Sequence, residues 1–254
     1  MDRLERALEK ARQKRATLRA VPAQDNARTA ILPAPNSLSP DDERRLDAYR
    51  IVAHRPRSQK ADIYRQLRTK VLHKMNASGF KTLAVTSPYY GDGKTTVTLN
   101  LGISLALDLK QTVLLVDLDL RKPCLHRPLN LTPQAGLTDY LLRQKPLVDC
   151  LLRPPFERIS LLPAGPASEQ SSELLASPKM INLAHELKTR YADRFVLYDM
   201  PPVLAQDDSI AFLPQVDAIL VVIRDGVTKI DDLKRCLNAL SGANVIGTVL
   251  NNCW

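Results

Sequence analysis

From about residue 58 onward, short apolar runs alternate with amphipathic segments, and this pattern predicts strands and helices in turn. The predicted strands are Leu83–Ser87, Thr112–Leu118, Ile159–Pro163, Phe195–Asp199, Ala218–Ile223 and Val245–Asn251. The predicted helices are Ser58–Met75, Thr95–Asp108, Gly136–Leu142, Pro178–Tyr191, Gln206–Leu213 and Lys229–Leu240. Strands that alternate with helices indicate βαβ units. We therefore expect an α/β fold with a mostly parallel sheet flanked by helices.

The first 57 residues follow a different pattern and predict two further segments. Small and apolar residues recur at roughly helical spacing among many charges, so residues 1–20 are expected to form a basic helix. Such a helix could dock on a partner or an anionic surface, or it could be a solvated tail. Prolines 22, 33, 35 and 40 mark residues 21–57 as a linker. The folded domain is then expected to span residues 58–254.

Composition and charge narrow the possible partners. Apolar residues make up 44% of the chain, enough for a core, and the formal net charge is +9. Residues 1–60 hold 14 basic against 8 acidic residues, so they carry +6 of that charge. A basic end fits an acidic protein, an anionic membrane surface or nucleic acid, or simply a solvated linker. Because no aromatic platform or nucleic-acid motif accompanies it, we do not expect nucleic-acid binding.

The cysteines and the hydropathy pattern bear on the compartment. The four cysteines (Cys124, Cys150, Cys236 and Cys253) are scattered, which argues against a zinc site or a disulfide framework. The N-terminus lacks the apolar core of a signal peptide. No apolar run approaches the ~20 residues of a membrane helix. A reducing cytoplasmic location without a membrane span of its own is therefore expected.

A phosphate-binding motif follows the first predicted strand and opens a helix. The segment PYYGDGKTT matches a P-loop, G-x-x-x-x-G-K-[ST], except that Pro88 replaces the first glycine. The nucleotide is expected to contact Gly91, Asp92, Gly93, Lys94, Thr95 and Thr96. Glycines let backbone N–H groups approach phosphate oxygens, and the helix N-terminus favours the negative charge. Lys94 is expected to reach the terminal phosphates of ATP and Thr95 to ligate Mg²⁺.

Acidic residues end two further predicted strands. Asp117 and Asp119 follow the run VLLV, and their alternation places both on one side of the chain. Asp199 ends the next buried strand, in the position of a Walker B carboxylate. Oxygen ligands suit magnesium, so Thr95, Asp117 and Asp199 form the predicted metal site. Lys94, Asp117 and Asp119 form the predicted catalytic set.

The order of these motifs resembles the cytoplasmic domain of bacterial tyrosine kinases (BY-kinases), which are P-loop proteins related to MinD and ParA. The D-x-D at Asp117–Asp119 is that family's Walker A′. Shorter matches between residues 60 and 252 are YRQLRT, AGLTDYL, LLPAG, SELLASPKM and VDAILVVIRDGVT. The opening LERALEKAR is similar to the branch associated with exosortase-type exopolysaccharide systems.

The resemblance implies an ATP- and magnesium-dependent tyrosine kinase in exopolysaccharide or capsule synthesis, with Asp117 as the general base. It also implies homo-oligomers through a helix that here carries Asp62, Arg65 and Arg68, with Asp in the place of the usual Glu. The expected partner is the cytoplasmic segment of a membrane chain-length regulator, a polysaccharide co-polymerase. The protein would then be peripheral at the inner face of the plasma membrane. In related ATPases the residue at the position of Asn251 contacts the base of the nucleotide.

Two alternatives remain open because the sequence departs from the family pattern. The C-terminal tyrosine cluster is missing, so the acceptor would be a partner's tyrosine or Tyr49, Tyr89 or Tyr90 of this chain. One alternative is a MinD/ParA-like ATPase switch, although Tyr89 stands where those relatives carry a second lysine. The other is an ATP-binding scaffold of the same machinery that phosphorylates no tyrosine.

Overall fold

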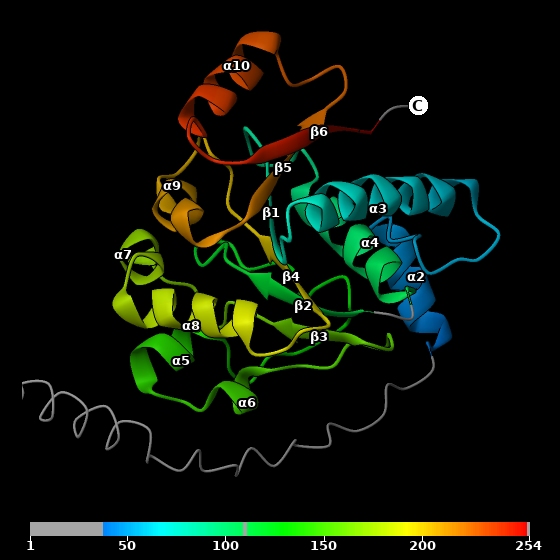
Figure 1. Ribbon diagram of the computed structural model, residues 1–254. Helices are drawn as coiled ribbons and strands as arrows, with labels where there is room; N and C mark the ends of the chain where they lie inside the picture. Colours follow the sequence, from blue (N-terminus) through cyan, green and yellow to red (C-terminus); the bar gives the residue numbers. More distant parts are fainter. Residues whose placement is uncertain (1–37, 109–110, 253–254) are drawn as a thin grey trace, which may run out of the picture. The chain divides into compact units, whose positions relative to one another are not determined.

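One parallel sheet forms the centre of the part of the chain that the computed structural model describes, residues 38–108 and 111–252 (Figure 1). Its six strands lie in the order β3-β2-β4-β1-β5-β6, and every neighbouring pair is parallel. The strands are β1 (Thr82–Thr86), β2 (Thr112–Asp117), β3 (Ile159–Leu162), β4 (Arg194–Asp199), β5 (Ala218–Arg224) and β6 (Val245–Asn251). This architecture confirms the predicted α/β class.

The central strands read as apolar runs because both of their faces are covered. All five residues of β1 are buried, whereas β6 at the edge is half-exposed along its length. Alternate side chains of the strands enter two separate cores, one on each face of the sheet. The sequence pattern of short apolar runs is what such doubly covered strands require.

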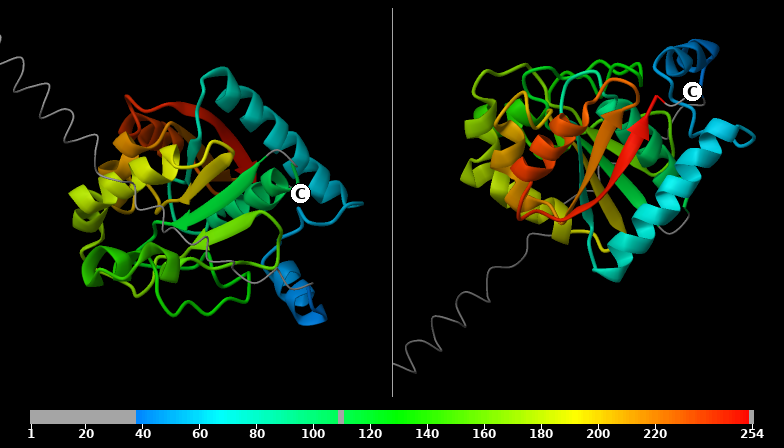
Figure 2. Two further views of the ribbon diagram at one scale, coloured as in Figure 1. Left: turned by 60° about the horizontal axis from the view of Figure 1, so that its bottom comes forward. Right: turned by 90° about the horizontal axis from the view of Figure 1, so that it is seen from above.

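Helices close both faces of the sheet (Figure 2). On one face lie α2 (Pro40–Ala48), α3 (Gln59–Ala77) and α4 (Lys94–Ala106). The other face is covered by α5 (Leu137–Arg143), α6 (Leu147–Cys150), α7 (Ser171–Leu175), α8 (Pro178–Thr189), α9 (Asp208–Phe212) and α10 (Ile230–Ala239). A 3₁₀ turn, η1 (Leu213–Gln215), follows α9. The predicted strands and longer helices match these elements to within a few residues.

Helix α2 corrects the predicted linker over its last part. Ser39 caps the helix in a capping box with Asp42, and Pro40 takes the first helical position, where a proline costs no hydrogen bond. Leu46 and Ile51 are fully buried in the core beneath α4. Residues 40–57 are therefore folded onto the domain, since these apolar side chains outweigh the helix-breaking composition around them. The predicted helix over residues 1–20 lies outside the described residues.

Helix α3 carries the residues predicted to form an oligomer interface. The Asp62 side chain is exposed, and it pairs with Arg65 one turn later. Arg65 also donates to the carbonyls of Arg55 and Pro56, and Arg68 donates to the Ser104 carbonyl at 2.8 Å. Both arginines thus bond within their own chain: Arg65 joins α3 to the segment before it, and Arg68 fixes α3 against α4. Self-association through this helix stays a prediction.

No helix among the described residues combines the length and the apolar character that crossing a bilayer requires.

Candidate nucleotide site

The loop between β1 and α4 has the backbone shape of a phosphate cradle. Gly91 and Gly93 have φ angles of 88° and 94°, in the left-handed region that glycine adopts most easily. A Cβ on Gly93 would stand 2.0 Å from Asn251 Nδ2, so any other residue there would have to push the Asn251 side chain aside and adopt a strained positive φ. Asn251 Nδ2 also donates to the Asp92 carbonyl at 2.9 Å. The loop is therefore held open at the N-terminus of α4, where anions bind.

Asp92 fixes the loop from the inside. Its side chain is buried and accepts hydrogen bonds from the Tyr89 amide at 3.0 Å and from the Thr228 hydroxyl at 3.2 Å. Asp92 thus ties the loop to the turn after β5 and orients it. If Asp92 contacts the nucleotide as predicted, it would do so through its backbone N–H, because its carboxylate already accepts two hydrogen bonds.

Lys94 reaches across the end of the sheet to Asp119. Its Nζ lies 3.1 Å from Asp119 Oδ2, and both side chains are almost completely buried. Burial opposes the charge on Lys94, but the carboxylates of Asp199 and Asp119 outweigh burial and raise the pKa of Lys94 above its ordinary value. Lys94 is therefore a fixed positive charge, as neutralising a phosphate requires.

A hydroxyl–carboxylate pair lies beside Lys94 and fits a magnesium ion. Thr95 Oγ1 donates to Asp199 Oδ2 at 2.7 Å, and Thr98 Oγ1 donates to Asp199 Oδ1 at 3.1 Å. Burial raises the pKa of Asp199 against the opposing effect of Lys94. Magnesium takes hard oxygen ligands from one or two protein side chains, with the rest from phosphates and water, so Thr95 and Asp199 suit it. In the described part of the chain no three His, Cys, Asp or Glu side chains form a metal cluster of their own.

Asp117 is the strand partner of Asp199 across β2 and β4, but its contacts differ. Its carboxylate accepts three backbone N–H groups, from Asp119 at 3.2 Å, Cys124 at 3.1 Å and Leu125 at 3.0 Å. Burial and the charge of Asp199 raise the pKa of Asp117 to about 7. Asp117 therefore shapes the turn that carries Asp119, while Asp119 is the carboxylate in contact with Lys94.

Side chains outside the predicted phosphate, metal and catalytic sets complete the site. Gln206 Nε2 donates to Tyr90 Oη at 2.6 Å, and that hydroxyl lies 3.5 Å from Asp119 Oδ1. Burial and Asp119 raise the pKa of Tyr90 to about 12. Arg121 pairs with the buried Asp208 at 3.3 Å. Thr98 had a signal in the sequence, since it falls on the same helix face as Thr95. Gln206 and Asp208 had none, because only the fold brings their loop to this site.

Most of the predicted phosphate and metal residues thus converge at the carboxyl ends of β1, β2 and β4, where ligands of parallel sheets bind. Thr96 is half-buried on the first turn of α4. Asn251 lies against the loop as the last residue of β6, and its contact with the base stays a prediction. Arg65 and Arg68 on α3 bond to carbonyls away from these carboxylates.

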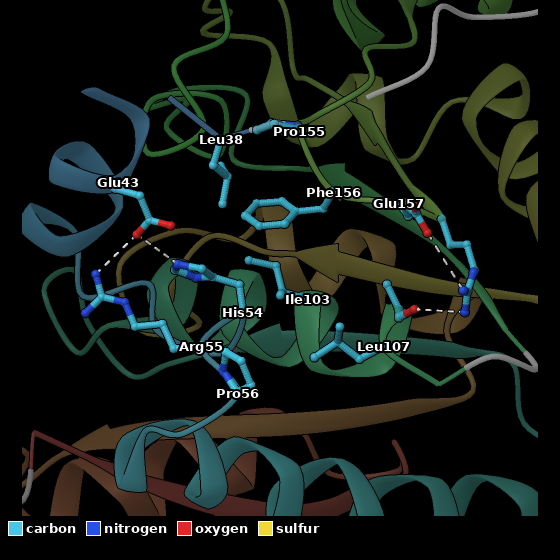
Figure 3. Close-up of a pocket in the computed structure, with 12 residues that line it drawn as sticks. Leu38, Glu43, His54, Arg55, Pro56, Ile103, Leu107, Pro155, Phe156 and Glu157 are labelled. Atoms are coloured by element: carbon cyan, nitrogen blue, oxygen red, sulfur yellow. Dashed lines mark hydrogen bonds and ion pairs between the residues drawn. The ribbon is translucent and has the colours of Figure 1, made fainter. Parts of the chain in front are cut away.

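A groove of about 550 Å³ lies at a different place, between α2, the C-terminal end of α4 and the loop before β3 (Figure 3). The His54 and Phe156 rings meet in it at a tilt of 49°, with ring centres 5.9 Å apart, and His54 Nε2 lies 3.2 Å from Glu43 Oε2. Its lining is mainly apolar, with charges at the rim (Figure 3). None of the predicted phosphate or metal residues lines it.

Comparison with known proteins gives this arrangement a family. Residues 83–253 match the CobQ/CobB/MinD/ParA nucleotide binding domain. Over 198 residues the chain is 31% identical to the tyrosine-protein kinase YwqD of Bacillus subtilis, covering 77% of this chain and 82% of the relative. It is 32% identical over 207 residues to the succinoglycan biosynthesis transport protein ExoP of Rhizobium meliloti, covering 80% of this chain but only 26% of that longer protein.

Solved structures agree with the sequence relatives. The chimerical protein CapA2B2 matches with a TM-score of 0.75 and 28% identity, covering 87% of this chain and 95% of that one. The kinase domain of the Escherichia coli tyrosine kinase ETK matches with a TM-score of 0.72 and 27% identity, over 77% and 76% of the two chains. MinD of Pyrococcus horikoshii, complexed with Mg-ADP, matches more distantly, with a TM-score of 0.55, 26% identity and coverage of 67% and 69%.

The fold and the loop therefore define a nucleotide-binding domain of the CobQ/CobB/MinD/ParA class. Within that class, the chain belongs to the family of bacterial tyrosine-protein kinases.

Proposed function

We propose that this protein is an ATP- and magnesium-dependent protein tyrosine kinase that regulates the synthesis, length or export of an exopolysaccharide. The observation that carries the proposal is the 3.1 Å contact between Lys94 and Asp119 at the end of the phosphate cradle. A fixed cation and a carboxylate side by side can stabilise a transferring phosphoryl group and accept a tyrosine proton. The names of the relatives, a tyrosine kinase and a succinoglycan transport protein, support this choice.

Bound ATP with magnesium would supply the transferable phosphoryl group, and the chain's own residues would position it. Backbone amides of the loop from Gly91 to Thr95 bind the phosphates at the start of α4. Thr95 and Asp199, two of the three predicted ligands, would hold the metal, while Asp117, the third, accepts backbone N–H groups. Lys94 would neutralise charge on the terminal phosphate. Such transfers depend mainly on positioning and charge stabilisation rather than on covalent chemistry by the protein.

The assignment of the proton acceptor follows from the contacts of the two carboxylates. The family pattern makes Asp117 the expected general base, and its pKa of about 7 suits that role. The contacts of Asp117 are backbone N–H groups, however, whereas Asp119 Oδ1 accepts the Lys122 amide at 3.1 Å and also lies 3.5 Å from the Tyr90 hydroxyl. We therefore assign proton acceptance to Asp119 and orientation of its turn to Asp117.

The partner and location follow from the same relatives. We infer that the chain works beside the cytoplasmic segment of a membrane chain-length regulator and as a homo-oligomer at the inner face of the membrane. ExoP, of which this chain spans about a quarter, combines a matching segment with further sequence in one protein. A partner protein could supply that further sequence here.

Purified protein incubated with γ-labelled ATP and magnesium, with and without the regulator's cytoplasmic segment, tests the proposal. Label on protein tyrosine that Lys94→Ala abolishes supports a kinase. Free phosphate without labelled protein would instead indicate an ATPase switch of the MinD kind. Nucleotide binding with neither product would leave an ATP-binding scaffold.

A further inference from the structure

Tyr90 lies in the phosphate loop with its ring beside Lys94 and its hydroxyl near Asp119. It precedes Lys94 by four residues, and the Lys94 Nζ lies 5.7 Å from the centre of its ring. Lys122 Nζ covers the same ring at 4.3 Å. If Lys94 binds the terminal phosphates as proposed, the Tyr90 ring beside it would lie at the end of the nucleotide where transfer takes place.

The hydroxyl of Tyr90 is oriented by two partners. Gln206 Nε2 donates to Oη at 2.6 Å and thereby occupies one of its lone pairs. The phenolic proton then points to Asp119 Oδ1, 3.5 Å away, at the outer limit of a hydrogen bond. A nucleophilic oxygen and a carboxylate that can take its proton are thus already adjacent.

The other tyrosines do not reach this site. All seven tyrosines lie within the described residues, and none falls in the last 56 residues of the chain. The neighbouring Tyr89 turns to α10, where its hydroxyl donates to Asp232 at 3.2 Å. Tyr198 is fully buried in the core on the other side of β4.

From these contacts we propose that Tyr90 is the chain's own phosphate acceptor and is modified in cis, a step that rests on the proposed kinase function. Tyr90 Oη forms a bond to the terminal phosphorus of ATP while the bond from that phosphorus to the bridging oxygen breaks. ADP leaves with the bridging oxygen, and the phenolic proton passes to Asp119. The product carries its charge beside Lys94 and Lys122, which are placed to compensate it.

A phosphate on Tyr90 would occupy the space that the terminal phosphate of the next ATP needs. Self-modification should therefore stop at a single phosphate per chain and weaken ATP binding afterwards. This outcome would give the loop a regulatory role.

The test uses the full chain, first treated with a phosphatase and then incubated with γ-labelled ATP and magnesium. Trypsin releases residues 82–94 as one peptide containing both loop tyrosines, and fragment-ion spectra assign the label to one of them. We expect label on Tyr90 in the wild type and in the matched control Tyr89→Phe, and its loss in Tyr90→Phe. Label that persists on another residue as the main product would overturn the proposal.

Mixing variants separates transfer within a chain from transfer between chains. A Lys94→Ala chain keeps Tyr90 but cannot perform transfer, and a Tyr90→Phe chain lacks the acceptor. Their mixture should stay unlabelled on Tyr90, whereas label on the Lys94→Ala chain would refute modification in cis.

A synthetic Glu-Tyr copolymer distinguishes failure of this proposal from failure of the kinase function. If the wild type labels the copolymer but not Tyr90, the acceptor assignment is wrong and the kinase function stands. If neither is labelled, the kinase function itself fails, and the acceptor assignment with it.

Discussion

The phosphate site and the groove beside α2 differ in where their charged side chains lie. At the phosphate site, Lys94, Asp117, Asp119 and Asp199 are all buried. Lys94 pairs with Asp119, backbone N–H groups satisfy Asp117, and threonine hydroxyls satisfy Asp199. In the groove, an apolar lining opens to about 550 Å³ and the charged groups remain at its rim. The volume of a pocket therefore does not identify the functional site of this protein. The site is identified by buried ionisable residues that contact one another and have shifted pKa values, because burying such groups together is costly and is characteristic of functional sites.

The largest expected effect comes from removing the cation of the phosphate site. Lys94→Ala should lower phosphoryl transfer by on the order of 10²–10³-fold, because the transferring group loses its charge partner. Initial rates of label transfer from ATP measure this effect. As a control from the groove, His54→Ala should keep the wild-type rate. Equal loss in the two variants would mean that the regions are not functionally distinct.

The shape of the loop can be tested separately from its charge. Gly93→Ala should abolish nucleotide binding, because the new Cβ would collide with Asn251 Nδ2 and the backbone has a positive φ. Calorimetric titration with ATP and magnesium measures the loss. Gly247→Ala is the matched control, since a Cβ at that position meets no atom within 4 Å. Tight binding by Gly93→Ala would show that the loop does not cradle phosphate in this conformation.

The metal ligands predict a smaller, magnesium-specific effect. Thr95→Ala removes the hydroxyl that donates to Asp199 and should raise the magnesium concentration for half-maximal activity by roughly 10–100-fold. Thr95→Ser keeps the hydroxyl and should stay near the wild type. A magnesium titration of the transfer rate compares them, and an unchanged requirement in Thr95→Ala would remove Thr95 from the metal site.

The raised pKa of Asp117 predicts how pH affects the nucleotide-free protein. Because the folded-state pKa of about 7 lies above the ordinary value of 3.8, the folded state holds a proton that the unfolded state releases. This contribution to stability is present at pH 4 and lost as pH rises through about 7. Asp199 is also raised, so the two carboxyls titrate together. Thermal unfolding from pH 5 to 8 should show a shallower decline in Asp117→Asn than in the wild type, and identical slopes would contradict this.

Substitutions in the groove should affect stability and leave nucleotide binding unchanged. Phe156→Ala removes a half-buried ring that packs at a tilt against His54 and should lower the free energy of unfolding by about 1–3 kcal/mol. Denaturant titration measures this loss. The affinity for ATP should remain that of the wild type, and a weakened affinity would connect the two regions.

The sequence predicted the sheet and the phosphate site because local pattern determines them. The apolar runs of β1, β2 and β4 and the glycines before Lys94 each carry their own signal. Helix α2 was missed because four prolines between residues 22 and 40 suggested a linker, although Ser39, Pro40 and Asp42 form a recognisable helix start.

Contacts between distant segments could not be predicted from the sequence. The bond from Gln206 to Tyr90 joins residues 116 positions apart, and the bond from Arg68 to Ser104 depends on how α3 packs against α4. The sequence and the family resemblance favoured Asp117 as metal ligand and general base. Only the fold shows that backbone amides engage Asp117 and that Lys94 contacts Asp119.

The central claim is that the buried charges around Lys94 transfer phosphate to tyrosine. The most direct measurement is the formation of phosphotyrosine from γ-labelled ATP, with magnesium and a Glu-Tyr copolymer, by the wild type and by Lys94→Ala. The account predicts labelled tyrosine with the wild type and a rate lower by on the order of 10²–10³-fold with the variant. Release of free phosphate by the wild type, with no label on any tyrosine, would contradict it.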